Sequence, residues 1–156
     1  MVKQLLSIFA AIIITGFCLV NVCAQAPRAS VSASEANGTF RSYFKGKYKG
    51  SSSQIKILAL GGGKLKIEMD LIYPFTDGTG ELSANMGTLT GIAEISGDTA
   101  VYSSEEFGVC RITIKFAKPG TIEVSQEGVS SCGFGHRVTA DGTYKKTGGK
   151  KPRLER

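Results

Sequence analysis

The amino-acid sequence predicts an all-β protein, an eight-stranded antiparallel meander closed as a small barrel. Beyond residue 38, apolar side chains recur at every second position, which is the period of a strand with one buried face. Glycine and proline mark tight turns between these alternating segments. Both ends of the region carry a Gly-x-Tyr step, at 46–48 and 142–144, and we expect these ends to pair because closure removes exposed strand edges. A two-sheet β-sandwich is the alternative.

Residues 1–24 have the organisation of a secretory signal peptide. Lys3 supplies the positive charge, an uncharged and mostly apolar run follows it, and small residues precede a cleavage position after Ala24. The apolar run is shorter than the ~20 residues that cross a bilayer as a helix, and an uncleaved membrane anchor is the alternative. We therefore expect a secreted or periplasmic protein with no transmembrane span in its mature chain.

Three segments make up the mature chain. Residues 25–37 are small and polar, and we expect a disordered leader there. Residues 38–146 hold the β-barrel domain. Residues 147–156 are expected to form a flexible basic tail, because glycine and proline interrupt any period that could pack.

The strands are expected to follow one another with short turns between them. The clearest is the segment 64–71, in which Leu65, Ile67, Met69 and Leu71 share one face while lysine and acidic residues occupy the other. Glycine and proline at the turns suit tight hairpins. The turns lie at 61–63, 97–98 and 119–120, and the eight strands span residues 39–49, 54–60, 64–73, 87–96, 99–104, 109–117, 121–126 and 136–146.

Every second side chain of these strands is expected to face the barrel interior. In the first and last strands these are the even-numbered positions, among them Phe44, Gly46, Val138, Ala140 and Gly142. If the bulky inward side chains fill the centre completely, only surfaces remain for binding. This inward set is Tyr48, Ile57, Leu65, Ile67, Met69, Ile112, Ile114 and Tyr144.

Two of the four cysteines, Cys110 and Cys132, remain in the mature chain, and we expect them to form one disulfide. Exported proteins mature in an oxidising compartment, where an even pair of cysteines is typically bonded. A redox-active or zinc-bound pair is the alternative, but the sequence has no CxxC motif and His136 would leave a zinc site short of ligands. We expect no metal and no other cofactor.

Positive charge is concentrated at the C-terminus. The protein has 19 Lys and Arg against 13 Asp and Glu, and residues 145–156 alone contain six positive side chains and one negative. If the last strand pairs with the first, a basic seam forms that suits an anionic envelope surface, although a solvated row of lysines guarding a strand edge is the alternative. Specific nucleic-acid binding is not expected, because no aromatic side chains are interleaved with the charges of the tail. The seam consists of Arg41, Lys45, Lys47, Lys49, Lys145 and Lys146.

Residues 74–86 form the longest connection without an expected strand. Loops of this length often bind partners. We expect this loop to cover the barrel mouth or to contact a partner through Phe75, Leu82, Asn85 and Met86.

A glycine-rich run after Cys132 contains two further candidates. Phe134 is expected to plug a barrel end or to contact a ligand, and His136 is the only histidine of the chain. A general base needs a partner and a cleft, and no nucleophile motif such as GxSxG accompanies His136. We therefore expect no enzyme, and a small enzyme that uses His136 is the least favoured hypothesis.

Several short runs resemble those of small bacterial secreted domains of unassigned function. They are GTLTGIA at 87–93, CRITIKF at 110–116, CGFG at 132–135 and ADGTYKK at 140–146. The architecture is similar to that of bacterial lysozyme inhibitors and of lipocalin-like or avidin-like binders, a likeness of fold alone. We expect a non-catalytic binding module for a small apolar molecule or an anionic envelope component, with an inhibitor of a cell-wall hydrolase such as lysozyme as the alternative.

Overall fold

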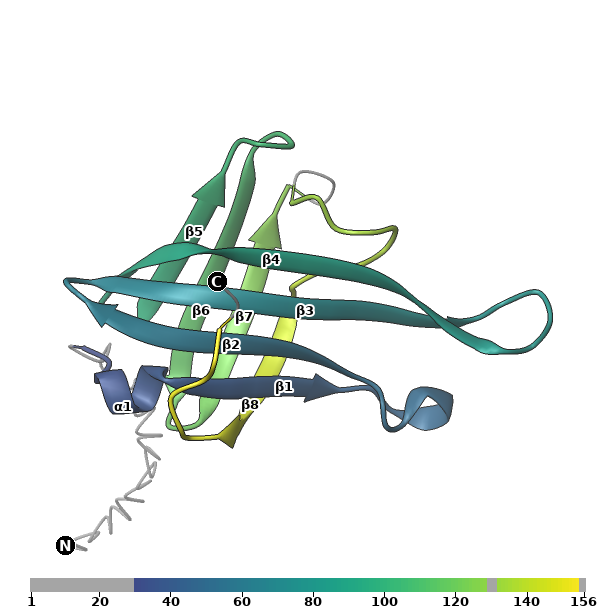
Figure 1. The fold of residues 1–156 in the computed structure, drawn as a ribbon, viewed down its shortest axis with the longest axis horizontal. Helices are drawn as coiled ribbons and strands as arrows, with labels where there is room; N and C mark the ends of the chain where they lie inside the picture. The colour runs from purple at the N-terminus through teal and green to yellow at the C-terminus, as the bar shows by residue number, and fades with distance from the viewer. Residues whose placement is uncertain (1–29, 129–131, 155–156) are drawn as a thin grey trace, which may run out of the picture.

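A computed structural model describes residues 30–128 and 132–154 (Figure 1). The predicted signal peptide, its cleavage position and residues 25–29 of the leader lie outside these ranges. In the described ranges, no helix is long and apolar enough to cross a membrane.

Eight antiparallel strands form a meander that closes into a barrel, because the last strand pairs with the first. The predicted all-β barrel is confirmed, and the sandwich alternative is wrong. In Figure 1, β1 to β4 cross the front of the barrel and β5 to β8 cross behind them. The strands are β1 (Gly38–Tyr43), β2 (Ser52–Gly61), β3 (Lys64–Thr76), β4 (Leu82–Ser96), β5 (Thr99–Ser104), β6 (Cys110–Lys118), β7 (Thr121–Glu127) and β8 (Gly142–Gly148).

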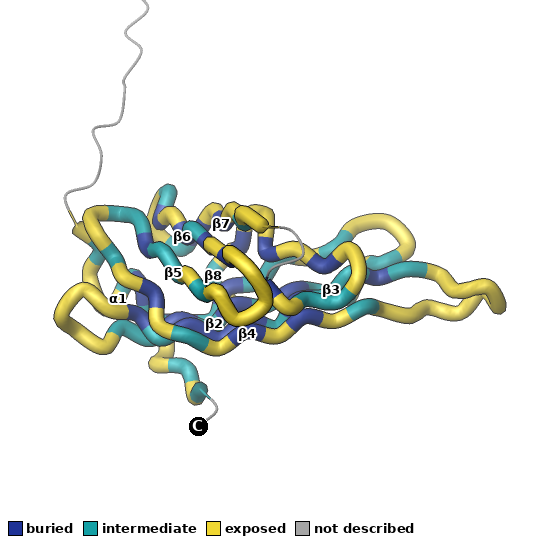
Figure 2. The backbone as a smooth tube through the Cα atoms, turned by 90° about the horizontal axis from the view of Figure 1, so that it is seen from above, coloured by how far each residue is buried: buried dark blue, intermediate teal, exposed yellow. Residues whose placement is uncertain are grey.

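The barrel interior is built by the alternation seen in the sequence (Figure 2). Along β3, Leu65, Ile67 and Met69 are buried, and the register places Ile55 and Ile57 of β2 opposite two of them. Burying one such side chain contributes roughly 1.5–3 kcal/mol. Of the eight side chains predicted to fill the interior, all are buried except Tyr48.

Tyr48 does not lie in the barrel interior, because the first strand is shorter than predicted. β1 ends at Tyr43, and the chain then forms the 3₁₀ turn η1 (Gly46–Tyr48). Gly46 has a φ of 63° and Gly50 a φ of 104°, values that an extended strand does not contain. The inward row of even positions therefore does not continue through Gly46, and the lysines of this segment lie in a connection instead of on a strand.

The last strand is also shorter at its start than predicted. β8 begins at Gly142. Residues 132–141, called the crossing segment below, cross the end of the barrel without strand pairing. Val138 and Ala140 are buried as predicted, whereas Gly142 is exposed. The Tyr144 hydroxyl lies inside and donates to the Ala140 carbonyl oxygen at 3.0 Å. The alternation of apolar residues in this segment therefore reflects a buried cap rather than a strand.

Residues 74–86 are not a structureless loop. The β3–β4 ladder continues to the pair Thr76 and Leu82, so only residues 77–81 form a turn, and the hairpin projects beyond the other strands (Figure 1). Asp77 closes this turn by accepting from the Thr79 amide, the Thr79 hydroxyl and the Glu81 amide at 2.9, 2.7 and 3.0 Å. These bonds, led by the one from the Thr79 hydroxyl, hold the pKa of the Asp77 carboxyl below its ordinary value.

The described part of the predicted disordered leader contains a short helix, α1 (Ala33–Ala36). Ser32 caps it by accepting from the Glu35 amide at 3.3 Å, and Ala36 is buried against the barrel. Lys146 points inward at this end and donates from Nζ to the Ser34 and Glu35 carbonyl oxygens, both at 3.0 Å. Burial lowers the pKa of Lys146, while the charge of Glu35 acts in the opposite direction.

The C-terminal segment is only partly a tail. Thr147 and Gly148 belong to β8, in contrast to the predicted boundary at residue 147. Residues 149–154 then pass in front of β2 and β3 (Figure 1), where Pro152 and Leu154 are half-buried. On the outer face of the same two strands, Lys56 of β2 forms an ion pair with Glu68 of β3.

The predicted disulfide joins Cys110 to Cys132, and both residues are buried. Cys110 begins β6, so the bond fixes the crossing segment to the barrel wall. For a sequence separation of 22 residues, the chain-entropy model assigns about 3 kcal/mol to such a bond.

Tyr144 makes the stability of the fold sensitive to alkaline pH. Burial, and to a smaller extent the charge of Asp141, raises the pKa of the Tyr144 hydroxyl well above its ordinary value. The folded protein therefore keeps a proton that the unfolded chain releases above about pH 10, and we expect this residue to remove about 1.4 kcal/mol of stability per pH unit above that point. Tyr144→Phe should cost about 1 kcal/mol at pH 7 through the lost hydrogen bond.

The measurement is urea unfolding of the protein and of Tyr144→Phe between pH 7 and 11, with Tyr43→Phe as the exposed control. The stability difference between the protein and Tyr144→Phe should shrink above pH 10. A difference that stays constant to pH 11 would contradict the assignment.

Because Gly87 has no side chain, Phe134 can pack directly against the backbone at position 87. A Cβ atom at position 87 would lie 2.8–2.9 Å from three atoms of Phe134, including its Cβ, which cannot swing away. Gly87→Ala should therefore displace the crossing segment and lower the free energy of unfolding by about 1–3 kcal/mol.

Gly78→Ala is the matched control, because nothing lies within 4 Å of a Cβ there. Phe134→Gly removes all three of these atoms, so Gly87→Ala should cost less in that background than it does in the unmodified protein. Equal unfolding midpoints for Gly87→Ala and Gly78→Ala would show that Phe134 does not pack on Gly87.

Candidate functional site

The two ends of the barrel differ in the length of their connections. At one end, the turn end, each connection between strands has two residues, and α1 packs there. At the other end, the loop end, the connections are longer. Ordering a long loop costs more conformational entropy than ordering a two-residue turn, so the longer connections do not favour folding. Binding residues concentrate on such loops, so the loop end is the candidate site. Its connections are residues 44–51, 77–81, 105–109 and 128–141.

The four residues predicted from the segment 74–86 lie at the loop end but on opposite faces of one hairpin. The register continues the interior row of the barrel through Phe75 and Asn85, whereas Leu82 and Met86 point to the outer side. Because successive side chains of a strand alternate between faces, these four residues cannot form one binding surface.

The inner face of the hairpin is covered by the crossing segment. Phe134 is half-buried over Gly87, and the Gly135 amide donates to the Met86 carbonyl oxygen at 3.0 Å. The Asn85 side-chain amide donates to the His136 carbonyl oxygen at 2.8 Å. The structure thus brings Asn85, Phe134 and His136 together, but Asn85 and the His136 backbone are used to hold the segment in place.

Sequence reasoning missed two residues of this contact. The Arg137 guanidinium lies 4.6 Å from the centre of the Tyr73 ring, and Arg137 has a φ of 63°, uncommon for a residue with a side chain. No local signal in the sequence pairs the two residues, because the crossing segment and β3 are far apart along the chain.

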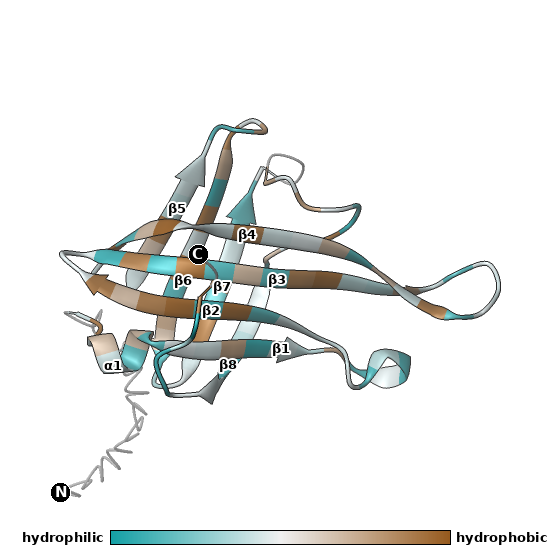
Figure 3. Cartoon of the chain, viewed as in Figure 1, coloured by the Kyte–Doolittle hydropathy of each residue, from teal (hydrophilic) through white to brown (hydrophobic). Residues whose placement is uncertain are grey.

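Apolar residues lie near the tip of the hairpin (Figure 3), and two of them are exposed on its outer face. Leu82 and Met86 are each 65% exposed, and Met86 lies opposite Ile72 in the ladder. Tyr43 of β1 lies on the outer face of the same sheet, opposite Ser52 of β2, and is 58% exposed. Leu82, Met86 and Tyr43 are called the apolar row below.

Three lysines of the predicted basic seam lie beside the apolar row. Lys45, Lys47 and Lys49 are exposed in the connection that contains η1, and Lys47 Nζ donates to Thr76 Oγ1 at 3.0 Å. Thr76 is the ladder partner of Leu82, so this bond places the lysine connection against the hairpin. These three residues are called the loop-end lysines below.

The other residues of the predicted seam lie on β1 and β8. Arg41 and Lys145 lie opposite each other in the β1–β8 ladder, and Arg41 Nη1 donates to Ser52 Oγ at 3.2 Å. Lys146, also predicted for the seam, does not point the same way as Lys145. The Lys146 side chain lies on the same face of β8 as Tyr144 and donates hydrogen bonds to backbone carbonyl oxygens of the α1 segment.

A second exposed group at the loop end is acidic and aromatic. Glu105 and Glu106 are exposed in the β5–β6 connection, followed by Phe107 at 63% and Val109 at 69% exposure. A Cβ on Gly133 would lie 3.0 Å from the Phe107 ring, so this connection packs beside the disulfide. Sequence reasoning missed Phe107 and Val109. The signal that could have identified them is that two large apolar residues occur in a connection between strands, where no buried face requires apolar residues.

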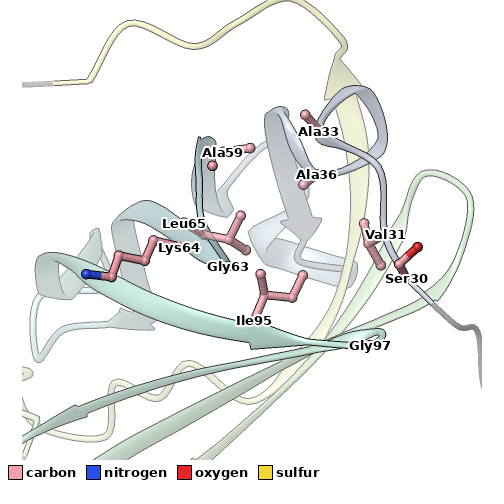
Figure 4. A pocket seen from close by; sticks show the side chains of 11 residues that line it. Ser30, Val31, Ala33, Ala36, Ala59, Gly63, Lys64, Leu65, Ile95 and Gly97 are labelled. Carbon is pink, nitrogen blue, oxygen red and sulfur yellow. The ribbon is translucent and has the colours of Figure 1, made fainter.

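An apolar hollow lies beneath α1 at the turn end (Figure 4). Its volume is about 310 Å³, and Val31, Leu65 and Ile95 contribute its larger apolar side chains. In the close-up the Lys64 side chain points away from the hollow. In the two described ranges, no group of three or more His, Cys, Asp or Glu residues is arranged to hold a metal ion.

Comparison with known proteins adds no assignment to this geometry. No protein-family model, no curated protein and no solved structure matches the chain.

Proposed function

We propose that the protein is an exported, non-catalytic binding module that engages an anionic component of the cell envelope with its loop end. The observation that carries the proposal is the contact between the loop-end lysines and the hairpin that bears the apolar row, made by Lys47 and Thr76. Exposed apolar residues next to exposed cations form a surface suited to an anionic and partly apolar partner.

The filled interior supports a surface role over internal carriage of a ligand. Ile55, Ile67 and Ile114 are completely buried in the centre, and α1 and the crossing segment pack at the two ends. Ligand pockets generally enclose about 300–1,000 Å³. The hollow beneath α1 is at the lower limit of that range, at about 310 Å³, and the larger hollows, of about 560 and 670 Å³, are formed by surface turns and connections and not by the barrel interior. A small apolar ligand is therefore the less supported choice.

The geometry of His136 supports a non-catalytic role. His136 contributes its backbone carbonyl oxygen to the contact with Asn85, and its side chain is exposed. An imidazole acts as a general base when a second group orients it beside a substrate-sized cleft. The contact with Asn85 orients the backbone of His136, but it does not orient the imidazole ring.

Inhibition of a cell-wall hydrolase is the second candidate function, and the acidic β5–β6 connection favours it. Glu105, Glu106 and Phe107 are exposed together, and the disulfide fixes the base of the connection at Cys110. A rigid loop with two carboxylates and an aromatic side chain suits a cationic cleft.

The proposal predicts salt-sensitive binding to cell envelopes. The exported protein should co-sediment with bacterial envelope fragments at low salt and be released by high salt, because the lysine contribution is electrostatic. Replacing Lys45, Lys47 and Lys49 by Gln should weaken binding about tenfold or more, since each lysine near an anionic surface contributes about 1 kcal/mol.

The matched control replaces Lys64, Lys115 and Lys118 by Gln, which removes the same charge from exposed positions outside the loop end. Equal weakening by the two triple variants would reject the loop end as the binding face. A co-sedimentation that does not change with salt would reject the anionic partner.

The second candidate predicts slower lysis of bacterial cell walls by lysozyme when the protein is added. The variant with Glu105→Gln, Glu106→Gln and Phe107→Ala should lose this inhibition, whereas Glu94→Gln with Glu123→Gln, on exposed strand positions, should keep it. Unchanged lysis in the presence of the protein would exclude lysozyme as a target and leave the leading proposal intact.

A further inference from the structure

We propose that the anionic partner is a phospholipid bilayer, and that the outer face of the β3–β4 hairpin docks on it. In this arrangement Leu82 and Met86 enter the headgroup region while Lys45, Lys47 and Lys49 contact lipid phosphates. The inference rests on the proposed function and names the partner of the same surface.

The first argument is the direction of the apolar row. Leu82 and Met86 occupy alternate positions of β4 and therefore point the same way, and both are 65% exposed although they are large and apolar. Tyr43 lies on the outer surface of the same sheet, with two strands between β1 and β4, and 58% of its surface is exposed. An aromatic ring with a polar hydroxyl suits the boundary between lipid and water.

The second argument is the position of the positive charges. Lys47 Nζ bonds to Thr76 Oγ1 at 3.0 Å, and Thr76 faces Leu82 across the ladder, so the lysine connection borders the apolar row. Interfacial binding to membranes combines buried apolar area with attraction to anionic headgroups. A soluble anion would use the lysines alone, whereas a bilayer uses both groups.

The third argument is the placement of the acidic groups. Asp77 and Glu81 occupy the hairpin tip, and Asp77 is already engaged by three hydrogen bonds within its turn. Because these carboxylates would be repelled by anionic lipid, the hairpin docks along its side and not with its tip. The acidic β5–β6 connection belongs to strands that cross behind the hairpin in Figure 1, away from the docking face.

Vesicle binding tests the partner. The exported protein should bind vesicles of phosphatidylglycerol mixed with phosphatidylcholine and should not bind phosphatidylcholine alone. Leu82→Ser with Met86→Ser should weaken binding about tenfold. The matched control is Leu60→Ser with Ile92→Ser, exposed apolar positions of the same sheet that are 51% and 46% exposed and lie away from the hairpin tip.

The basic C-terminal tail is the competing source of vesicle binding. A chain ending at Gly148 keeps β8 and Lys146, and we expect it to bind vesicles nearly as well as the full protein. Loss of binding in this chain, with full binding by the Leu82 and Met86 variant, would overturn the proposal in favour of the tail.

The absence of tryptophan from the sequence allows a direct test of orientation. Leu82→Trp places a reporter on the outer face and Ser83→Trp places one on the inner face of the same strand. With vesicles, emission of the first variant should shift to the blue and be quenched by brominated lipid, while the second should stay unchanged. Equal responses of the two variants would overturn the docking orientation.

The outcomes separate this inference from the proposed function. Binding to envelope fragments that depends on the loop-end lysines, together with no binding to anionic vesicles, would overturn the bilayer and leave the loop end as the binding face. If protease treatment of the fragments then abolished binding, the partner would be an envelope protein.

Discussion

The pairing of β8 with β1 is the contact on which the rest of the structure depends. It consists of three residue pairs with a bulge between Thr39 and Phe40, far fewer than the β3–β4 ladder contains. On the other edge of β8, the Lys146 amide donates to the Gly120 carbonyl oxygen beside β7 at 2.8 Å, while the Lys146 side chain bonds to α1. Gly38 is required beside it, because a Cβ there would collide with Lys146 and with the Gly148 backbone.

Closure as a meander divides the barrel into two unequal ends. Since every strand reverses direction, alternate connections fall at the same end, and all the short turns gather at the turn end with α1. The turn end is further joined by the Ile95 amide, which donates to the Gly63 carbonyl oxygen at 2.8 Å. The loop end can therefore vary in length and composition while the turn end maintains closure.

A filled interior and a projecting hairpin together explain why binding is proposed at a surface. The inner face of the hairpin is used by Asn85, Gly87 and the crossing segment, which seals the barrel and buries Val138. The outer face presents Leu82 and Met86, two large apolar side chains that are each 65% exposed. One hairpin thus serves structure with one face and supplies the candidate binding surface with the other.

Properties that depend on near neighbours along the chain were predictable from the residues alone. Alternation identified the interior row Leu65, Ile67 and Met69, glycine and proline located the turns, and the cysteine count identified the single disulfide. These signals are local or compositional, so they do not require knowledge of the fold. Positive φ values at Gly46 and Gly50, which end β1 early, are not visible in alternation, because glycine is compatible with both strand and turn.

Only the tertiary structure decided which predicted residues share a surface. Extension of the β3–β4 ladder separated Phe75 from Leu82, and the β1–β8 register turned Lys146 inward while leaving Lys145 outside. The contact between Lys47 and Thr76 joined two segments that the sequence analysis had treated separately. Alternation along a strand decides which face of the sheet a side chain lies on. Its neighbours on that face depend on the register of the adjacent strands, which is set by hydrogen bonds between segments far apart in the sequence.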